Sequence, residues 1–298
     1  AGQLCPFSRC QRQPLDRPVC KFCPSSQTIK YCDFRKKSKR VSDQTTSDKS
    51  VAGTVYLIGA GPGDPDLLTV KAARLLSMAD VVVYDRLVSD AVMDLVPEDS
   101  PLIYAGKASK NHSMPQPDIN ALLVSLSHEH QTVVRLKGGD PFIFGRGSEE
   151  AIHLAEHSVP FQIVPGISAA SGCSAYLGVP LTHRGLATGV RYVTGHTQEE
   201  ELDLDWENLA DPDTTLVVYM GLANLGAISD RLVAAGLSAD TPVAAVERGT
   251  TPQQRHCITT LKDAVGDVAN AKLGPPCLIV IGKVAGIAGT LEWWQPGD

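Results

Sequence analysis

The sequence predicts an α/β protein that is built from two α/β domains. The chain has 298 residues, of which 43% are hydrophobic and 20% charged. This is enough for two modest domains with buried cores. From residue 54 onward, short β-branched runs alternate with helical patterns, as in proteins whose sheets are parallel. No stretch contains the roughly 18 to 20 consecutive apolar residues of a membrane-spanning helix, so we expect no membrane association.

The first predicted domain covers residues 51–166 and starts with a strand, a helix and a second strand. The run TVYLIGA at 54–60 is the first strand, and the helical pattern at 64–79 follows it. Asp64 is the expected N-cap of that helix and Pro65 its first residue, where the missing N–H costs nothing. The later elements are strands at 80–85, 101–106, 132–138 and 161–166 and a helix around 116–128.

The second predicted domain covers residues 167–286, and residues 287–298 form a tail. A helix rich in small residues at 167–178 leads out of the last strand of the first domain. An amphipathic helix is expected at 223–236. The strand candidates are 190–196, 214–221, 241–249 and 276–283. We expect this domain to contain a mixed sheet.

Residues 1–50 form a basic extension that contains Cys5, Cys10, Cys20, Cys23 and Cys32. The extension lacks apolar periodicity, so we expect it to be disordered. Cys20 and Cys23 have the spacing of a zinc site, but no second CxxC pair or spaced histidine pair accompanies them, so we predict no metal. The basic composition also fits a transit peptide, and we expect a cytoplasmic location, or a plastid one in a photosynthetic eukaryote.

The charge distribution argues against nucleic acid as a partner. The first fifty residues hold 11 basic and 4 acidic residues, whereas the rest hold 16 and 29. Nucleic acids select clustered Lys and Arg. The remaining cysteines, Cys173, Cys257 and Cys277, are isolated, as in a reducing compartment.

Three glycine-containing loops follow predicted strands and are the candidate ligand sites. GAGPGD at 59–64 resembles a dinucleotide fingerprint, although Asp64 replaces its third glycine. A structural turn is the alternative there. KGGDPFIFGRGSEE at 137–150 places Gly138 and Gly139 after another strand, where a flat ligand can lie on the backbone. PGISAASG at 165–172 is the third loop, for which helix packing explains the small residues equally well.

Basic and acidic residues beside these loops are candidates for binding and catalysis. Arg86, Lys107, Arg146 and Arg184 are expected at strand ends and together suggest a site for a polycarboxylate. Each of them alone fits a surface ion pair. Asp85 and Lys107 are candidates for acid–base work. We interpret His112, His183 and His196 as hydrogen-bonding residues.

The ordered motifs together resemble the uroporphyrinogen-III C-methyltransferases of the tetrapyrrole methylase family, over residues 54–286. The motifs are VYLIGAGPGDPDLLT (55–69), VVYDRLV (82–88), GK (106–107), LKGGDPFIFGRGSEE (136–150), VPGISAASG (164–172), PLTHRG (180–185), YVTGH (192–196), VVYMGL (217–222) and VERGTTPQQR (246–255).

The resemblance implies a homodimer that carries its active site in a cleft between two domains. It implies transfer of methyl groups from S-adenosylmethionine to C2 and C7 of uroporphyrinogen III, giving precorrin-2 and S-adenosylhomocysteine. It assigns Asp85 and Lys107 to proton transfer. The residues implied for the cofactor are Pro62, Gly138, Gly139, Asp140, Ile143, Ser168, Ala169, Met220 and Gly249. Those implied for the tetrapyrrole are Arg86, Arg146, Glu149, Arg184 and Met220.

Two departures from the family pattern accompany the resemblance. Lys110 and Asn111 precede His112 where the family often has glycine, and the extension has no counterpart in the minimal enzyme. The residues after the extension leave no room for a dehydrogenase–ferrochelatase module, so we expect the product to be precorrin-2. The alternatives are a methylase of a later corrin or of diphthine, a nucleotide-dependent oxidoreductase and a non-catalytic tetrapyrrole-binding module.

Overall fold

The structure, a computed structural model, describes residues 52–108, 112–195 and 203–295. The predicted extension at 1–50, its CxxC pair, Lys110, Asn111 and His196 lie outside the described residues. In the described part no group of His, Cys, Asp and Glu side chains is arranged to hold a metal ion. No helix there is long and apolar enough to cross a membrane.

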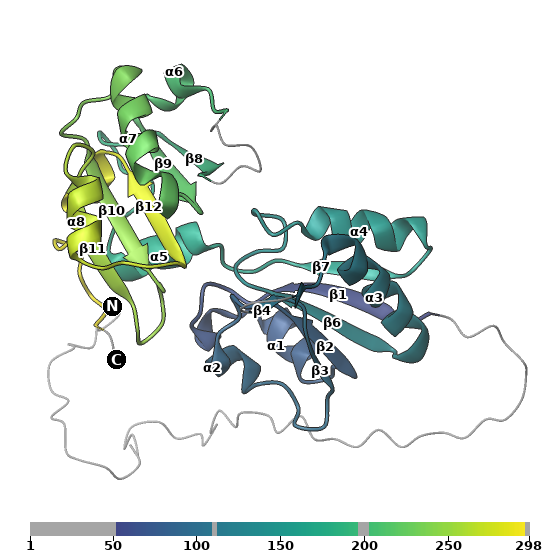
Figure 1. The fold of residues 1–298 in the computed structure, drawn as a ribbon. Helices are drawn as coiled ribbons and strands as arrows, with labels where there is room; N and C mark the ends of the chain where they lie inside the picture. Colours follow the sequence, from purple (N-terminus) through teal and green to yellow (C-terminus); the bar gives the residue numbers. More distant parts are fainter. Residues whose placement is uncertain (1–51, 109–111, 196–202, 296–298) are drawn as a thin grey trace, which may run out of the picture. The chain divides into compact units, whose positions relative to one another are not determined.

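The first sheet is wholly parallel, as the sequence predicts (Figure 1). Its order is β3-β2-β6-β1-β7. Parallel pairing with crossover helices buries both faces of such a sheet, which explains the nearly continuous apolar runs. The strands are β1 (Thr54–Gly59), β2 (Val81–Tyr84), β3 (Leu102–Tyr104), β6 (Thr132–Lys137) and β7 (Phe161–Val164).

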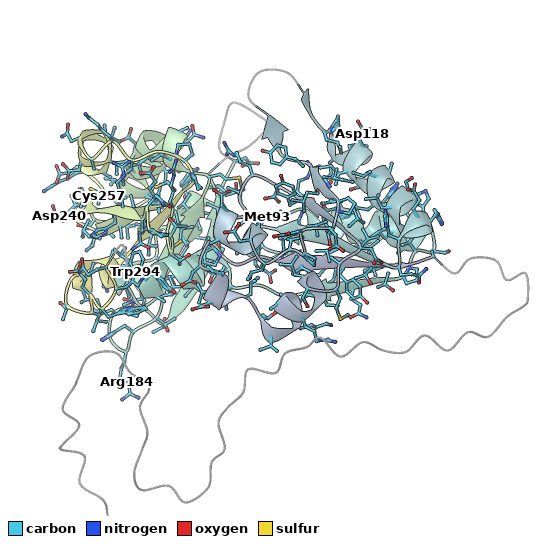
Figure 2. The ribbon with its side chains drawn as sticks, turned by 90° about the horizontal axis from the view of Figure 1, so that it is seen from below. Met93, Asp118, Arg184, Asp240, Cys257 and Trp294 are labelled. Carbon is cyan, nitrogen blue, oxygen red and sulfur yellow. The ribbon has the colours of Figure 1, made fainter. Side chains whose placement is uncertain are left out.

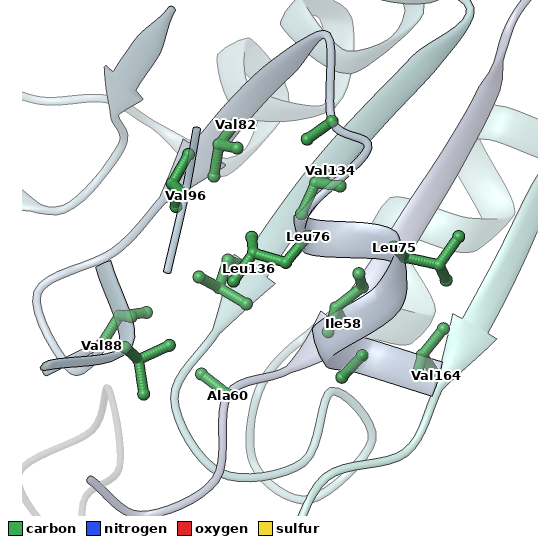
Figure 3. Close-up of a cluster of buried hydrophobic side chains, with 13 residues drawn as sticks. Ile58, Ala60, Leu75, Leu76, Val82, Val88, Val96, Val134, Leu136 and Val164 are labelled. Atoms are coloured by element: carbon green, nitrogen blue, oxygen red, sulfur yellow. The ribbon is translucent and has the colours of Figure 1, made fainter. Parts of the chain in front are cut away.

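Two apolar clusters cover the two faces of this sheet. On one face, Ile58, Val134 and Leu136 pack against Leu76 of α1 (Val70–Leu76) (Figure 3). On the other face, Leu57 and Val133 pack against α3 (Gln116–Glu129) and α4 (Gly147–Glu156). Alternate residues of β6 therefore face different helices.

The first predicted helix is divided in two, so the predicted start at Pro65 is wrong for the α-helix. Asp64 caps a 3₁₀ turn, η1 (Pro65–Leu67), through a 2.8 Å hydrogen bond from the Asp66 amide. Leu68 is then extended. Thr69 caps α1 by accepting from the Ala72 amide at 3.1 Å, and this second capping residue restarts the chain as an α-helix.

Three short elements lie between β2 and α3 in addition to β3. They are a single helical turn, α2 (Asp90–Met93), and an antiparallel pair of strands, β4 (Lys107–Ala108) and β5 (His112–Ser113). His112 thus belongs to the two-residue strand β5.

The second sheet is mixed, which confirms the sequence prediction. Its order is β11-β10-β12-β9-β8; β8 and β9 are parallel and the other neighbours antiparallel. The strands are β8 (Gly189–Thr194), β9 (Thr214–Tyr219), β10 (Pro242–Glu247), β11 (Arg255–Thr260) and β12 (Cys277–Ile281). β11 lies at the sheet edge and was not predicted, because its sequence RHCITT is polar and half exposed.

Helices cover this sheet too. On one face α5 (Ala169–Leu177) contributes Ala170, Cys173 and Leu177 to a cluster with the strands. Leu225, Ile228 and Leu232 of α7 (Leu225–Ala234) belong to a second cluster. The remaining elements are α6 (Trp206–Leu209), η2 (Leu222–Asn224), α8 (Ala264–Asn270) and η3 (Lys283–Ile287). The domain boundary at 166/167 stays a prediction.

Candidate active site

Three loops meet at the carboxyl edge of the parallel sheet. They follow β6, β1 and β7, which are neighbours in the sheet. Gly61 and Gly139 exchange two backbone hydrogen bonds, of 2.7 and 3.2 Å, which join the first loop to the second. Strands that run in the same direction end at the same edge, where open α/β sheets bind ligands. The candidate loops of the sequence are thus brought together.

Close packing explains why glycines stand at 59 and 166. A Cβ at Gly166 would lie 2.3 Å from the Gly139 carbonyl oxygen, and one at Gly59 would lie 2.6 Å from it. Gly139 itself has a left-handed backbone, with φ +69°, and a Cβ there would meet only the Ala169 amide nitrogen, at 3.8 Å. A side-chain carbon therefore has room at Gly139 but not at Gly59 or Gly166.

Asp140 shapes the second loop. One of its carboxylate oxygens accepts from the Phe142 amide at 2.8 Å, and the other accepts from the Gly166 amide at 3.0 Å. The half-buried Ile143 follows, and its amide donates to the Asp140 carbonyl. Phe144 and Arg146 both have positive φ values, of 50° and 57°. Such backbone conformations in non-glycine residues cluster at functional sites.

The first loop is also fastened to residues from the second half of the chain. Pro62 packs on Gly172 of α5, where an added Cβ would lie 2.4 Å from the proline ring. The Tyr176 hydroxyl donates to the Asp64 carboxylate, and the Asp64 amide donates to the Thr250 hydroxyl at 3.2 Å. Burial and this carboxylate raise the pKa of Tyr176 to about 12.

An aromatic contact joins the second loop to β9. The Phe144 and Tyr219 rings lie 4.9 Å apart between centroids, and the Tyr219 hydroxyl oxygen accepts from the Ala170 amide at 3.0 Å. Ser168 caps α5 by accepting from the Ser171 amide. Ala169 follows, and Met220, directly after Tyr219, is 52% exposed with φ +54°. The Tyr219 hydroxyl thus ties the start of α5, which Ser168 and Ala169 form, to the strand that Met220 follows.

Gly249 is held by packing on α5. A Cβ at this position would lie 2.3 Å from Cys173 Sγ. Its two neighbours, Arg248 and Thr250, have positive φ values of 48° and 67°. The loop after β10 is therefore strongly bent, and it lies beside the first loop through the Thr250 hydrogen bond to Asp64.

The two predicted catalytic residues follow neighbouring strands. Asp85 comes directly after β2, and its carboxylate accepts from the Leu87 amide at 3.0 Å. Its second oxygen lies 3.7 Å from Arg135 Nη2. Lys107 follows β3, which pairs with β2, and the structure describes its backbone only. The Asp85 carboxylate is thus anchored beside a buried cation.

Two predicted substrate residues pair with one another. Arg146 holds Glu149 in a bidentate ion pair, with two bonds of 2.7 Å. The hydrogen bond from Arg146 lowers the pKa of Glu149, and that from Glu149 raises the pKa of Arg146. Both side chains are about half exposed. Arg146 precedes the first residue of α4 rather than ending a strand.

The other two arginines lie on the surface. Arg86 is exposed next to Asp85. Arg184 lies in the turn that His183 and Ala187 close by backbone hydrogen bonds, and not at a strand end. Figure 2 shows its side chain pointing away from the ribbon.

The sequence model of the Tetrapyrrole (Corrin/Porphyrin) Methylases matches residues 54–265. The chain belongs to this family. The site loops described above all lie inside the matched range, so the resemblance inferred from the motifs is confirmed.

Relatives of this methylase include bacterial siroheme synthases. The siroheme synthase of Azotobacter vinelandii is 53% identical over 243 residues, which are 82% of this chain and 52% of the relative. That of Nitrosospira multiformis is 51% identical over 253 residues, which are 85% of this chain and 54% of the relative. The methylase chain thus spans about half the length of the curated relatives it matches.

Solved structures share the fold of the methylase. The uroporphyrin-III C-methyl transferase from Thermus thermophilus, complexed with S-adenyl homocysteine, is 41% identical. The match covers 79% of this chain and 94% of that one, with a TM-score of 0.68. A cobalt precorrin-4 methyltransferase is 27% identical over 78% of this chain and 95% of that one, with a TM-score of 0.70. The predicted tetrapyrrole methylase fold is therefore confirmed.

Several residues of the candidate site were not predicted from the sequence. Three aromatic side chains join the loops, and their sequence positions do not distinguish them from core or loop aromatics: Phe144, Tyr176 and Tyr219. Arg135 and Lys137 stand in a strand and were not singled out. The signal for these two was present, because TVVRLK places two cations at alternate positions of a buried strand, where charge is rare unless it is paired.

Proposed function

We propose that this methylase transfers methyl groups from S-adenosylmethionine to C2 and C7 of uroporphyrinogen III and forms precorrin-2 through precorrin-1. The observation that carries the proposal is the 41% identity to a uroporphyrin-III C-methyl transferase complexed with S-adenyl homocysteine, over 79% of this chain and 94% of that one. The siroheme synthases of Azotobacter vinelandii and Nitrosospira multiformis share more than half of their matched residues with this chain, which supports a role in making that type of tetrapyrrole.

The loops at the carboxyl edge fit a cofactor with a flat base and a charged amino-acid end. Gly139 leaves open the space that a side chain would fill. The other residues that we assign to S-adenosylmethionine, besides Gly139, are Pro62, Gly138, Ile143, Ser168, Ala169, Met220 and Gly249. Asp140 is also assigned to the cofactor site, where one carboxylate oxygen accepts from the Phe142 amide of its own loop and the other accepts from the Gly166 amide of the third loop.

The bound cofactor supplies an activated methyl group on a sulfonium. A pyrrole carbon contributes the electron pair of the new C–C bond, and the C–S bond breaks to leave S-adenosylhomocysteine. The protein has to align the two reactants and to accept the proton that the macrocycle releases. Asp85 is the proposed acceptor, since its carboxylate lies 3.7 Å from Arg135 Nη2 and is anchored by the Leu87 amide. Lys107 is the proposed donor.

Arginines are the proposed partners of the tetrapyrrole carboxylates. Arg86 is exposed beside Asp85, and Arg146 can present its half-exposed guanidinium while Glu149 holds two of its donors. We also assign Arg184 to these carboxylates, and we assign Met220 to contact with the tetrapyrrole. A homodimer and a place in the bacterial cytoplasm complete the proposal, the second supported by the bacterial source of the relatives.

A later corrin is the second candidate substrate. The cobalt precorrin-4 methyltransferase matches with a TM-score of 0.70, as high as that of the uroporphyrin enzyme. The fold therefore does not separate the two substrates. The higher sequence identity favours uroporphyrinogen III.

Incubation of the purified chain with uroporphyrinogen III and labelled S-adenosylmethionine, without oxygen, tests the proposal. Mass spectrometry is expected to find two added methyl groups on the tetrapyrrole. Asp85→Asn is expected to lower kcat by about 10²- to 10⁴-fold while calorimetry still detects cofactor binding. Arg146→Ala is expected to raise the tetrapyrrole KM instead. A folded chain that binds the cofactor but methylates only a later corrin would overturn the substrate assignment.

A further inference from the structure

Three charged side chains lie buried on one face of the parallel sheet. Arg135 and Lys137 stand at alternate positions of β6, each with a side chain 4% exposed, and Glu150 of α4 is fully buried. They lie on the side of the sheet that packs against α3 and α4. None of the three belongs to the residues assigned to the cofactor or the substrate.

Hydrogen bonds join these residues into one cluster. Glu150 Oε1 accepts from Arg135 Nε at 3.1 Å, from Lys137 Nζ at 2.9 Å and from Gln116 Nε2 at 3.3 Å. The Arg135 guanidinium reaches outward as well, and its Nη2 lies 3.7 Å from the Asp85 carboxylate. Arg135 thus connects the buried carboxylate to the proposed proton acceptor.

Burying this cluster costs free energy of folding, which a purely structural feature would not require. Buried ion pairs are often no more stable than apolar side chains of similar volume. Glu150 Oε2 is buried and has no hydrogen-bond partner among the described residues, which adds to the cost. Burial, and secondarily Arg135, lowers the pKa of Lys137, although Glu150 opposes this effect. Stability alone therefore does not account for these buried charged side chains, and we look for a role in the reaction.

We propose that Glu150 and Lys137 are positioning residues that set the charge balance around Arg135 and thereby tune the Asp85 carboxylate. Glu150 holds the Nε edge of Arg135 and leaves Nη2 directed at Asp85. Lys137 offsets the negative charge of Glu150, so that the guanidinium stays available to Asp85. The inference rests on the proposed function, because it concerns the reaction for which Asp85 accepts the proton.

The charged residues of the buried cluster, and those that follow Asp85 or its neighbouring strand in the chain, come from a few elements. Arg86 follows it on its own segment, and Lys107 comes after the neighbouring strand β3. Arg135 and Lys137 come from β6, and Glu150 comes from α4. Among them, Glu150 and Lys137 have opposite charge, are buried beside the same guanidinium and can be neutralised separately. This makes the charge balance testable.

The test is the pH profile of kcat in Glu150→Gln, Lys137→Met and the double variant. Loss of the Glu150 charge leaves excess positive charge near Asp85, so the midpoint of the acidic limb is expected to fall by about one pH unit. Loss of the Lys137 charge is expected to raise the midpoint by a similar amount. The double variant is expected to return close to the wild-type value.

A purely structural role predicts a different pattern. It would lower activity or stability without moving the midpoints in opposite directions, and unchanged midpoints, or shifts of the same sign, would overturn the inference. If Glu150→Gln does not fold, the double variant is compared with Lys137→Met, and a lower midpoint in the double variant is required. If only Lys137→Met folds, its midpoint must rise.

Two further variants show whether a negative result contradicts the role of Asp85 or only its coupling to Glu150 and Lys137. Glu247→Gln removes another buried carboxylate, which pairs with Arg255 in the second sheet, and is expected to change stability but not the midpoint. Asp85→Asn is expected to abolish the acidic limb. If the limb persists in Asp85→Asn, the proposed role of Asp85 is wrong and the inference falls with it. If the limb is lost there but unmoved in the Glu150 and Lys137 variants, only the coupling is wrong.

Discussion

The two sheets of the methylase present their site residues in different ways. In the first sheet every strand is parallel, so all the loops at its carboxyl edge are neighbours. In the second sheet β9 and β10 are each antiparallel to β12. They therefore run in the same direction, and Met220 and Gly249 follow them at one edge. Strand direction, and not the type of sheet, brings predicted site residues together.

The loops of the two sheets are also held differently. At the first sheet, backbone packs on backbone, as Gly166 does on the Gly139 carbonyl. At the second sheet, the Gly249 backbone packs on a side chain, that of Cys173. A side chain can be shortened or turned, whereas a neighbouring backbone cannot. The first set of loops should therefore tolerate less change than the second.

Gly166→Ala is the strongest test of this comparison. The new Cβ would lie 2.3 Å from the Gly139 carbonyl oxygen, so the loops must separate. We expect the free energy of unfolding to fall by about 2–3 kcal/mol and S-adenosylmethionine to bind at least about tenfold more weakly. Urea unfolding and calorimetry measure the two effects.

Gly266→Ala is the matched control for that variant. Gly266 lies in α8, and no atom apart from its chain neighbours and its own helix backbone lies within 4 Å of an added Cβ. Alanine is the better helix former, so stability should rise by about 0.5–1 kcal/mol. Equal destabilisation by both variants would show that the close approach of the loops has no special importance.

Gly249→Ala should be milder and partly reversible. We expect a loss of about 1–2 kcal/mol in the free energy of unfolding, because the new methyl group meets Cys173 Sγ. Cys173→Ala removes that sulfur. The double variant should be more stable, by about 0.5–1 kcal/mol, than the sum of the single effects predicts, whereas strict additivity in a double-mutant cycle would contradict the comparison.

Tyr176→Phe should have the smallest effect and a pH dependence of its own. The lost hydrogen bond to Asp64 is expected to lower the free energy of unfolding by about 1 kcal/mol at neutral pH. The pKa of Tyr176 is raised from 10.0 to about 12 in the folded chain, so this stabilisation is complete below pH 10. It is lost as pH rises through the folded pKa.

Urea unfolding of both proteins between neutral pH and pH 12 measures this difference. The gap between wild type and Tyr176→Phe should shrink as the phenol ionises. A gap that is independent of pH would show that the hydroxyl does not stabilise the first loop through Asp64.

Most strands could be predicted from local sequence, because short β-branched apolar runs strongly favour buried strands. The parallel direction of β1, β2 and β6 was predictable from the alternation of strands and helices. Strand β11 was not, since an edge strand exposes polar residues much as a loop does. The start of α1 was also missed, because both Asp64 and Thr69 are good capping residues and only the surrounding packing selects between them.

The sequence by itself determined the family and the three loops of the candidate site, because those features depend on residue types in a fixed order. The tertiary structure alone decided which residues touch across them. The cluster of Arg135, Lys137 and Glu150 and the contact of Tyr176 with Asp64 join residues from separate elements. Whether a charged side chain is paired and buried depends on what packs against it, and local sequence does not contain that information.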